Sequence, residues 1–504
     1  MRYADLFGAL PHRWWKGHDD REVDHVAQDS RKVRAGSVFV AIPGRATDGL
    51  RHVREALARG ARDVVVGSGR AGAPELAGAE RIIEVDDERV ALAVMSRNLH
   101  GRIDETMPIV GVTGTNGKTT TCSLVAACLE ASGVKTGVLG TVVYRLGDEE
   151  CTAGLTTPEA PDIHDYLQRM AGAGCGACVM EVSSVALDRG RVHGMRFSAA
   201  VFTNLTRDHL DYHGDMEAYF KAKSLLFEGL AAPACAVINI DDAYGRRLAS
   251  RHDAPGPGAG VRRVTYGTTP GADVGLVSLE TGVAGTVVTL VEREGGRMTL
   301  RSRLVGRPNA SNIAAAAATA RAMGVAPDRI EEGIASVKAV PGRLESVTGS
   351  RGRQEFAVYV DYAHTDDALR GVLETVRQVT GGRLIVVFGC GGDRDRTKRP
   401  LMGEHAERLA DIVYVTSDNP RSERPESIID EIVAGMKHGG TGGGRVHVEP
   451  DRRKAIEAAI ASALPGDAVV IAGKGHETYQ ICGDRVAHFD DREVAREALD
   501  RHLD

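Results

Sequence analysis

A glycine-rich stretch at residues 109–121, IVGVTGTNGKTTT, has the residue types and spacing needed to bind phosphate. A short apolar run precedes Gly114, Gly117 and Lys118, and apolar residues at helical spacing follow, which predicts a strand, a loop and a helix. Backbone N–H groups in such a loop bind an anion, the lysine adds a positive charge, and a threonine hydroxyl can ligate Mg²⁺. We therefore expect a nucleoside triphosphate to bind here.

The loop departs from the usual P-loop pattern at one position. Val112 stands where that pattern has its first glycine. An ordinary glycine turn before a helix is the structural alternative. The order of Lys118 and Thr119 at the predicted helix start favours the phosphate loop.

The segment around this loop alternates strands and helices from residue 106 to about residue 340. Alternation of this kind predicts a mostly parallel sheet with helices on both faces and ligands at the carboxyl ends of the strands. The predicted strands are Ile109 to Val112, Gly137 to Gly140, Cys178 to Val182, Ala199 to Phe202 and Ala236 to Ile240.

Polar residues follow two of these strands directly. Glu181 ends one strand, and the run from Thr203 to His213, which includes His209, follows the next. A carboxylate and a histidine beside a phosphate loop are suitable metal ligands, although Mg²⁺ prefers oxygen and keeps several waters. For Glu181 alone, a surface salt bridge is the alternative interpretation.

Residues 1–105 mix short apolar runs with an amphipathic segment at 52–61, which predicts a small α/β domain. Its polar turns at 29–31 and 43–49 are weak candidates for binding, with plain loops as the alternative. Residues 287–291 and 297–304 predict a hairpin across Gly295-Gly296. The run 307–312 is expected to cap an alanine-rich helix at 313–323, with Asn309 or Ser311 as the N-cap.

Residues 341–504 predict a further α/β unit, and Pro341-Gly342-Arg343 is a plausible hinge before it. Four polar clusters follow its predicted strands. Ligands bind at the carboxyl ends of parallel strands, which we call the strand-end rule, so we expect these clusters to line one cleft. These clusters are 361–364 (DYAH), 389–394 (GCGGDR), 418–421 (DNPR) and 473–477 (GKGHE). The glycine tract at 439–444 is expected to be a surface loop.

Composition excludes several classes of protein. The 504 residues carry a formal net charge of −6, which offers no basic field for nucleic acid or an anionic membrane. No stretch is long and apolar enough to span a membrane. Eight scattered cysteines without zinc-site spacing favour reduced thiols in the cytoplasm.

The motifs taken together resemble the Mur ligase family over essentially the whole chain. The matching runs are GTNGKT at 114–119, EVSS at 181–184, NLTRDHLD at 204–211, DYAH at 361–364 and GKGHE at 473–477. The resemblance implies an N-terminal UDP-sugar-binding α/β domain at 1–105 and a central ATPase domain with a P-loop-type parallel sheet at 106–340. It also implies a Rossmann-like domain at 341–504 that binds the amino acid.

Within this family, the run DNPR at 418–421 resembles members that add 2,6-diaminopimelate to UDP-N-acetylmuramoyl-L-Ala-D-Glu during peptidoglycan synthesis. The implied reaction is ATP-dependent: the D-glutamate γ-carboxylate is phosphorylated, and the amine of diaminopimelate then displaces phosphate. The implied cofactors are ATP and Mg²⁺. Lys223 occupies the position of a carbamylated lysine in the family, and a monomer is expected.

The resemblance also implies a role for individual residues. The catalytic residues would be Lys118, Glu181, His209 and Lys223, and the metal ligands would be Thr119, Glu181, His209 and Lys223 as its carbamate. The ATP site would comprise Gly114, Thr115, Asn116, Gly117, Lys118, Thr119, Thr120, Asn309, Arg343 and His364. The UDP substrate would be bound by Ser30, Arg45, Ala46, Thr47, Thr156, Thr157, Ser183, Arg189 and Arg191. Diaminopimelate would be bound by Arg394, Asp418, Asn419, Pro420, Arg421, Gly473 and Glu477.

Two residues depart from the family pattern. Arg189 stands where well-known relatives have a glutamine that contacts the UDP substrate. Asp366 replaces a proline after Thr365, for which we expect a local change of turn that leaves His364 in place.

Three alternative functions stay open at this point. A lysine-adding ligase of the same family would need a different motif at 418–421. A folylpolyglutamate synthetase would lack the N-terminal domain. A nucleotide-dependent switch without ligase activity would not need the polar clusters of the last third.

Overall fold

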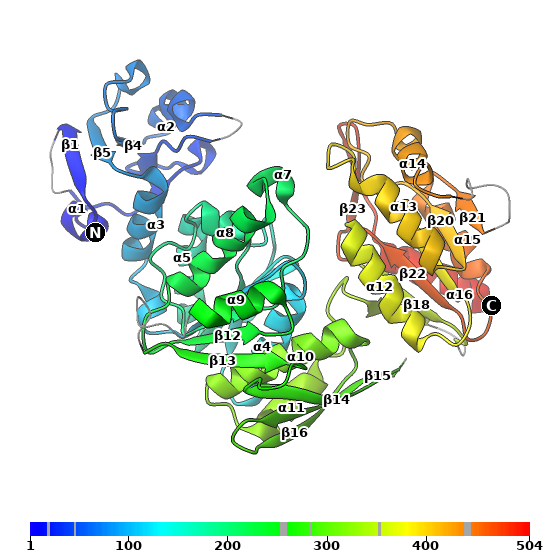
Figure 1. Cartoon of the computed structure of the whole chain (residues 1–504). Coiled ribbons are helices and arrows are strands. Elements are labelled where there is room, and N and C mark those ends of the chain that lie inside the picture. Colours follow the sequence, from blue (N-terminus) through cyan, green and yellow to red (C-terminus); the bar gives the residue numbers. More distant parts are fainter. Residues whose placement is uncertain are drawn as a thin grey trace.

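The computed structural model describes residues 1–17, 21–44, 47–251, 260–282, 284–350, 354–437 and 445–503. Its strands form three large sheets in succession along the chain and one small hairpin sheet. Figure 1 shows the three parts, from the blue N-terminal part through the green centre to the yellow and red last third. Each part is α/β, so the predicted fold class is confirmed.

The N-terminal sheet has the strand order β1-β5-β4-β3-β2 and is parallel except for β1. Its strands are β1 (His12–Lys16), β2 (Val26–Ala27), β3 (Val38–Val40), β4 (Asp63–Gly67) and β5 (Arg81–Val85). The helices are α1 (Tyr3–Phe7), α2 (Val53–Ala58) and α3 (Glu88–Leu99). Short 3₁₀ turns lie at η1 (Ser30–Lys32), η2 (Gly49–His52), η3 (Pro74–Leu76) and η4 (Ile103–Glu105).

The central sheet has the strand order β16-β15-β14-β13-β12-β11-β6-β10-β7-β8-β9. Strands β7, β10, β6, β11, β12, β13 and β14 pair in parallel, and antiparallel strands extend both edges. The strands are β6 (Ile109–Thr113), β7 (Thr136–Leu139), β8 (Val143–Leu146), β9 (Glu149–Thr152), β10 (Ala177–Glu181), β11 (Ala199–Phe202), β12 (Cys235–Asn239), β13 (Arg262–Gly267), β14 (Val274–Gly282), β15 (Gly285–Glu292) and β16 (Arg297–Ser302).

Helices cover both faces of the central sheet. They are α4 (Lys118–Ala131), α5 (Ala160–Gly172), α6 (Ser184–Asp188), α7 (Leu210–His213), α8 (Met216–Glu228), α9 (Ala243–Arg251), α10 (Arg307–Ala322) and α11 (Pro327–Ser336). Side chains of β6 alternate between two apolar cores: Val110 and Val112 pack with α4, α10 and α11, and Ile109 packs with α5 and α8. The alternation follows from the two-residue period of a strand.

The sheet of the last third has the strand order β17-β18-β22-β19-β20-β21, with all pairs parallel except β17–β18. Its strands are β17 (Glu345–Ser346), β18 (Ala357–Asp361), β19 (Leu384–Phe388), β20 (Ile412–Val415), β21 (Val446–Val448) and β22 (Ala468–Ala472), and β23 (Tyr479–Cys482) and β24 (Arg485–His488) form a separate hairpin. The helices are α12 (Asp366–Val379), α13 (Lys398–Leu409), α14 (Pro425–Val433), α15 (Arg452–Ala461) and α16 (Asp491–Leu503).

The structure corrects the sequence prediction at the alanine-rich helix. α10 starts at Arg307, with Gly306 as its N-cap, so the prediction of Asn309 or Ser311 as the cap is wrong. Asn309 lies inside the helix and donates to the carbonyl of Val305 at 2.9 Å. The predicted hairpin is present as β15 and β16.

Several predictions are not decided by the fold. The domain boundaries near residues 105 and 340 stay predictions, and most of the run 254–260 and the whole tract 439–444 lie outside the described residues. Among the described residues, no helix is long and apolar enough to cross a membrane.

Candidate active site

The phosphate loop connects β6 to α4 and depends on two glycines. Gly114 and Gly117 have φ angles of 149° and 85°, which residues with a side chain rarely adopt. A Cβ at Gly114 would overlap the hydroxyl of Thr203, and one at Gly117 would overlap the amide oxygen of Asn312. The loop therefore packs against the end of β11 on one side and α10 on the other.

Residues after β11 hold the loop in place. Thr203 donates its hydroxyl hydrogen to the carbonyl of Asn116 at 2.6 Å, and the N–H of Asn116 donates to Oδ1 of Asn204 at 2.9 Å. The N–H of Thr115 donates to the carbonyl of Asn204 at 2.9 Å. These contacts bring together two motifs whose contacting residues Asn116 and Asn204 lie 88 positions apart, as the strand-end rule predicts.

Lys118 is the first residue of α4 and folds back over the loop. Its ammonium donates to the carbonyls of Gly114 at 3.0 Å and Thr115 at 2.8 Å. Burial lowers its pKa, and the nearby Glu181 carboxylate opposes that shift. An ammonium has three donors, so one remains for a ligand.

Glu181 ends β10 and lies beside the first turn of α4. Its carboxylate accepts hydrogen bonds from the hydroxyl of Thr119 at 2.9 Å and from the N–H and hydroxyl of Thr141 at 2.7 and 3.1 Å. The side chain is buried. Arg343, from the last third, donates to the same Thr119 hydroxyl at 3.2 Å. The surface salt-bridge alternative for Glu181 is therefore wrong.

Lys223 lies in the middle of α8 and is fully enclosed, with 2% of its surface exposed. It donates to the carbonyl of Gly114 at 2.8 Å, and its ammonium nitrogen lies 4.6 Å from the ring centroid of Tyr219. Burial, with the positive charge of Lys118 as a second cause, lowers its pKa well below the ordinary value for lysine. The shift favours the neutral amine over the ammonium.

His209 lies next to this group, on the cleft side. It has a left-handed backbone with φ 53°, and Nε2 lies 3.5 Å from the carboxylate of Asp208. Desolvation lowers the pKa of His209, and Asp208 opposes the shift. Among the described residues, no three His, Cys, Asp or Glu side chains form a cluster that could hold a metal ion. The oxygen groups beside the loop are the hydroxyl of Thr119 and the carboxylate of Glu181.

The remaining residues assigned to ATP lie on three elements. Thr120 is buried in α4, and Asn309 is buried in α10, where it accepts a hydrogen bond from Asn312 at 3.2 Å. His364 belongs to the last third; its Nδ1 lies 2.8 Å from the carbonyl of Tyr362, and burial lowers its pKa. Arg343 stacks over the ring of Tyr362, with 4.9 Å from its guanidinium carbon to the ring centroid.

The residues assigned to the UDP substrate fall into two groups. In the central part, the hydroxyl of Thr157 donates to the carbonyl of Glu181 at 2.9 Å and accepts the N–H of Ser183 at 3.0 Å. Arg191 donates to the carbonyl of Thr157 at 2.7 Å and pairs with Glu159 at 2.5 Å. The hydroxyl oxygens of Thr156 and Thr141 lie 3.1 Å apart. This group therefore adjoins Glu181.

The second group belongs to the N-terminal part. Ser30 donates to Glu55 at 2.8 Å, and the hydroxyl of Thr47 lies 3.1 Å from Nε2 of His52. Arg45 and Ala46 lie outside the described residues. In the described part of the chain, no hydrogen bond or ion pair joins Ser30 or Thr47 to the central group.

Arg189 belongs to the central part. It contacts the ring and hydroxyl of Tyr212, with Nε 3.4 Å from the hydroxyl oxygen.

A cleft of about 720 Å³ lies between the central part and the last third. From the central part it is lined by residues 207–211, which include His209. From the last third it is lined by Tyr362, His364, Thr365, Asp366, Gly391, Asp393, Arg394, Asp395, Lys398, Asp418, Arg421, Gly473, Glu477 and Tyr479. All four polar clusters predicted for the last third therefore contribute to one cleft.

The wall formed by the last third holds opposite charges close together. Glu477 accepts the side-chain amide of Asn419 at 2.8 Å and pairs with the fully buried Lys474 at 3.3 Å. Burial raises the pKa of Glu477, Lys474 opposes the shift, and Asp418 adds to it. A Cβ at Gly473 would approach the Asp418 carboxylate to 2.5 Å, so the glycine allows this close packing.

Two arginines extend into the cleft. Arg421 donates one N–H to the carbonyl of Gly392 at 2.8 Å, which leaves other guanidinium donors for a ligand. Arg394 is exposed and donates to the carbonyl of Asp393 at 3.4 Å. Pro420, which separates Asn419 from Arg421, is buried.

Some residues that build this site were not assigned from the sequence. Thr141 lies two residues after the end of β7, so the strand-end rule could have found it. Lys474 lies inside a motif that was recognised, but the burial of this lysine beside Glu477 and Asn419 has no local sequence signal. Tyr219 and Lys398 also escaped assignment; Lys398 donates to the carbonyl of His364 at 2.7 Å.

Comparison with known proteins agrees with this geometry. Residues 112–320 match the Mur ligase middle domain, residues 342–475 match the Mur ligase glutamate ligase domain, and residues 22–100 match the catalytic domain of the Mur ligase family. A curated relative from Solibacter usitatus is 48% identical over 480 residues, covering 95% of this chain and 94% of its own length. The chain belongs to the Mur ligase family.

The relatives extend over nearly the whole molecule. The protein from Solibacter usitatus is named UDP-N-acetylmuramoyl-L-alanyl-D-glutamate--2,6-diaminopimelate ligase, as is one from Geobacter metallireducens that is 46% identical over 99% of this chain and 98% of its own. A solved structure of a ligase of that name has a TM-score of 0.68 and 33% identity over 99% of both chains. This Mur ligase is an ATP-dependent, amide-forming ligase, so the resemblance seen in the sequence is confirmed.

Proposed function

We propose that this Mur ligase joins 2,6-diaminopimelate to the D-glutamate γ-carboxylate of UDP-N-acetylmuramoyl-L-Ala-D-Glu, at the expense of ATP, in peptidoglycan synthesis in the cytoplasm. One observation carries the proposal: a single cleft has residues next to the phosphate loop on one wall and Arg394 and Arg421 on the other. The names of the full-length relatives support the choice of substrates.

The first step must activate a carboxylate, which is a poor electrophile at neutral pH. An oxygen of the γ-carboxylate attacks the γ-phosphorus of ATP, and the bond to the β-phosphate oxygen breaks, which gives an acyl phosphate and ADP. Two anions have to approach each other, so catalysis consists mainly of alignment and charge neutralisation. Lys118 and Arg343 supply fixed positive charge at the loop, and we assign them this role.

The donor set beside the loop fits Mg²⁺. Thr119 and Glu181 offer a hydroxyl and a carboxylate oxygen 2.9 Å apart, and oxygen is the ligand type that Mg²⁺ prefers. When bound, the ion would neutralise charge on the phosphates. We propose Thr119 and Glu181 as its protein ligands, with His209 and Lys223 near a second ion.

Lys223 is proposed to be carbamylated. Its neutral amine attacks the carbon of CO₂ and loses a proton, which replaces a cation with an oxygen ligand suited to Mg²⁺. The lowered pKa of this buried lysine makes the neutral amine available. ¹³C-labelled bicarbonate should give a carbamate carbon signal in the intact protein that Lys223→Ala lacks. Full activity of Lys223→Ala at low bicarbonate would contradict this assignment.

In the second step the amine of diaminopimelate attacks the acyl carbon, and phosphate leaves from a tetrahedral intermediate. Diaminopimelate differs from lysine by a carboxylate at its far end, and a guanidinium binds a carboxylate with two parallel hydrogen bonds. Arg394 and Arg421 are proposed to bind that carboxylate. Lysine would instead present an ammonium to these arginines and leave them without a carboxylate partner. We therefore expect the enzyme to discriminate against lysine by about a thousandfold or more.

The UDP-linked dipeptide is proposed to lie between the N-terminal part and Glu181. Ser30, Arg45, Ala46 and Thr47 would contact it from residues 1–105, and Thr156, Thr157, Ser183, Arg189 and Arg191 from residues 106–340. The salt bridge between Lys32 and Asp162, at 2.7 Å, joins these two parts and supports the arrangement. We also propose that residues 341–504 form the amino-acid domain and that the enzyme is a monomer.

The test measures ADP release with the UDP-linked dipeptide, with and without each amino acid. Release should require the dipeptide and either meso- or LL-diaminopimelate, with lysine far less effective. Preference for lysine would replace the proposal by a lysine-adding ligase. Release that ignores every amino acid would instead support a nucleotide switch.

A further inference from the structure

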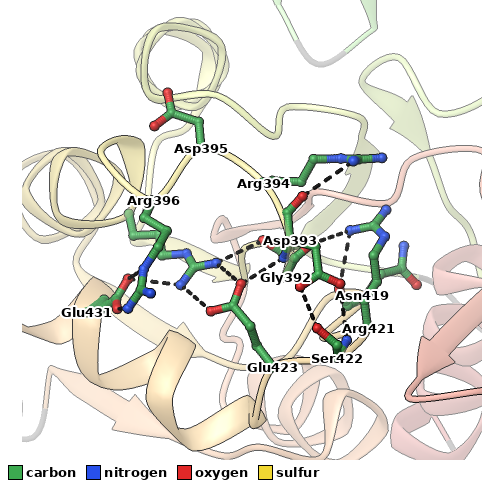
Figure 2. A network of polar contacts seen from close by, with 12 residues as sticks. Gly392, Asp393, Arg394, Asp395, Arg396, Asn419, Arg421, Ser422, Glu423 and Glu431 are labelled. Carbon is green, nitrogen blue, oxygen red and sulfur yellow. Dashed lines mark hydrogen bonds and ion pairs between the residues drawn. The ribbon is translucent and has the colours of Figure 1, made fainter. Parts of the chain in front are cut away.

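Two loops of the last third carry the arginines assigned to the far carboxylate of the amino acid. Arg394 follows β19, and Arg421 follows β20. Figure 2 shows both side chains extending to one side of Asp393, with Glu423 and Glu431 on the other side. The groups that fix these loops relative to each other also fix the spacing of the two guanidinium groups. The inference below rests on the proposed function.

Glu423 links the two loops through both of its carboxylate oxygens. Oε1 accepts the backbone N–H of Asp393 at 2.7 Å and an N–H of Arg399 at 2.7 Å. Oε2 accepts a second N–H of Arg399 at 2.9 Å. Glu423 lies two residues after Arg421, and Asp393 is the residue before Arg394. One carboxylate therefore holds the neighbours of both arginines.

Arg399 lies in the first turn of α13 and has no exposed surface. It also donates to Glu431 at 2.9 Å and to the carbonyl of Gly391 at 3.3 Å. Two carboxylates therefore pair with one buried guanidinium. Arg399 is not among the residues that line the cleft. Arg399 holds the loops and does not reach a ligand.

The loops need such support because two residues with side chains have left-handed backbones. Asp393 has φ 55° and Arg421 has φ 51°. Conformations of this kind are unfavourable for residues with a side chain and persist only when the surroundings enforce them. Ser422 donates its hydroxyl hydrogen to Asp393 at 2.6 Å, and Arg421 donates to the carbonyl of Gly392 at 2.8 Å. Each loop therefore stabilises the left-handed backbone of the other.

The backbones of the loops also approach closely. The N–H of Gly392 donates to the carbonyl of Asn419 at 2.9 Å, and a Cβ at Gly392 would overlap the carbonyl of Pro420. Hydrogen bonds from Arg399 and from the N–H of Asp393 lower the pKa of Glu423 to about 2. Its charge is therefore present throughout the neutral range, when the amino acid binds.

We propose that Glu423 is a positioning residue for amino-acid selection: through Arg399 and the N–H of Asp393, it sets the spacing of Arg394 and Arg421. A correct spacing favours an amino acid with a carboxylate at its far end over one that ends in an ammonium. Glu423 does not line the cleft, so it acts through the arginines and not by contact with the substrate.

Glu423→Gln tests this role directly. The amide keeps the size of the side chain, but its N–H₂ group faces an N–H of Arg399. One of the two hydrogen bonds between Arg399 and residue 423 is therefore lost. KM for diaminopimelate should rise about tenfold or more, while kcat and KM for ATP and for the UDP-linked dipeptide change less than about twofold. The preference for diaminopimelate over lysine should fall in proportion.

Glu431→Gln is the matched control, because Glu431 also pairs with Arg399 but, among the described residues, accepts no backbone N–H from either loop. Its other partner is the exposed side chain of Arg396. It should leave KM for diaminopimelate nearly unchanged. An equal rise of KM in Glu431→Gln would overturn the proposal, since it would make the effect one of the buried cluster in general.

Ser422→Ala provides a milder second variant, because it removes the hydroxyl contact to Asp393 at the surface and leaves Arg399 paired. It should also raise KM for diaminopimelate, by a smaller factor.

A double variant tests whether Glu423 acts through Arg421. In Glu423→Gln with Arg421→Ala, the rise of KM for diaminopimelate should not exceed that of Arg421→Ala alone. Fully additive losses would contradict an action through Arg421.

These outcomes separate the inference from the proposed function. If the wild-type enzyme uses lysine, the proposed function fails, and the KM of Glu423→Gln for lysine then still shows whether Glu423 positions the binding loops. An unchanged KM in Glu423→Gln, with diaminopimelate as the wild-type substrate, overturns only the inference.

Discussion

Arg343 donates a hydrogen bond to the hydroxyl of Thr119 over 3.2 Å, although 224 residues separate them in the chain. The contact joins the start of the last third to the first turn of α4, beside Lys118 and Glu181. The Nε of Arg343 is buried and has no hydrogen-bond partner among the described residues. A charged group with spare donors therefore faces the place where phosphate chemistry is proposed.

Arg343→Gln should lower kcat by about a hundredfold or more, because it removes a charged donor from the transferring phosphoryl group. Binding of the UDP-linked dipeptide should be unaffected, since no described contact joins Arg343 to the residues assigned to it. Steady-state ADP release and calorimetric titration of the dipeptide measure the two effects. A kcat within about threefold of wild type would remove Arg343 from the proposed mechanism.

Gly117→Ala should abolish ATP binding, because the new Cβ overlaps the amide of Asn312 in addition to the cost of φ 85°. Gly133→Ala is the matched control: Gly133 has φ 88° directly after α4, but nothing lies within 4 Å of its Cβ position. Both variants should lose about 1–3 kcal/mol of stability from backbone strain. Only Gly117→Ala should lose binding of a fluorescent ATP analogue.

Arg421→Ala should raise KM for diaminopimelate sharply, by about a hundredfold, because a bidentate contact to a carboxylate is lost. KM for ATP should stay at the wild-type value. Arg424→Ala is the control, since Arg424 lies three residues further on with 82% of its side chain exposed. Equal damage to both KM values would indicate a folding defect.

His164 should make the protein sensitive to mild acid. It is 1% exposed, its Nε2 has no partner among the described residues, and burial lowers its pKa to about 3 from the ordinary histidine value of 6.5. A lowered histidine pKa means that the unfolded chain binds the extra proton first, so stability is lost as pH falls below about 6.5. Between pH 7 and pH 5 the loss should be about 2 kcal/mol.

Urea unfolding of wild type and His164→Phe at both pH values measures this loss. His164→Phe removes the titrating group, so its loss of unfolding free energy between pH 7 and pH 5 should be smaller than that of wild type by about 2 kcal/mol. The exposed His193 provides the control substitution, His193→Phe, which should behave like wild type. Identical pH dependence in all three proteins would show that His164 is not the responsible group.

Much of the fold could be predicted because buried strands are short apolar runs. The predicted bounds at Ala199–Phe202 match the structure, and the other predicted strands of the central sheet differ from the observed ones by one residue at one or both ends. Strand β14 (Val274–Gly282) was missed because only some of its side chains are buried and polar residues interrupt the run. The start of α10 was placed too late because Arg307-Pro308-Asn309 resembles a cap, whereas proline fits the first turn of a helix.

The strand-end rule predicted the positions of the site residues better than their contacts. It placed Glu181 and His209 near the phosphate loop and gathered the four clusters of the last third into one cleft. It could not identify Arg399 and Glu423, because they act through an ion pair between two different elements, nor Lys474, because its complete burial beside Glu477 depends on tertiary packing. Such pairs depend on tertiary packing and leave no local pattern.

Isotope transfer tests the central claim most directly. The UDP-linked dipeptide, with ¹⁸O in its D-glutamate γ-carboxylate, is incubated with ATP and diaminopimelate, and product and phosphate are analysed by mass spectrometry. We predict that each amide bond formed releases one phosphate that contains one ¹⁸O, because a carboxylate oxygen leaves with the phosphoryl group. Phosphate without ¹⁸O, or ADP release without the tripeptide product, would contradict the account.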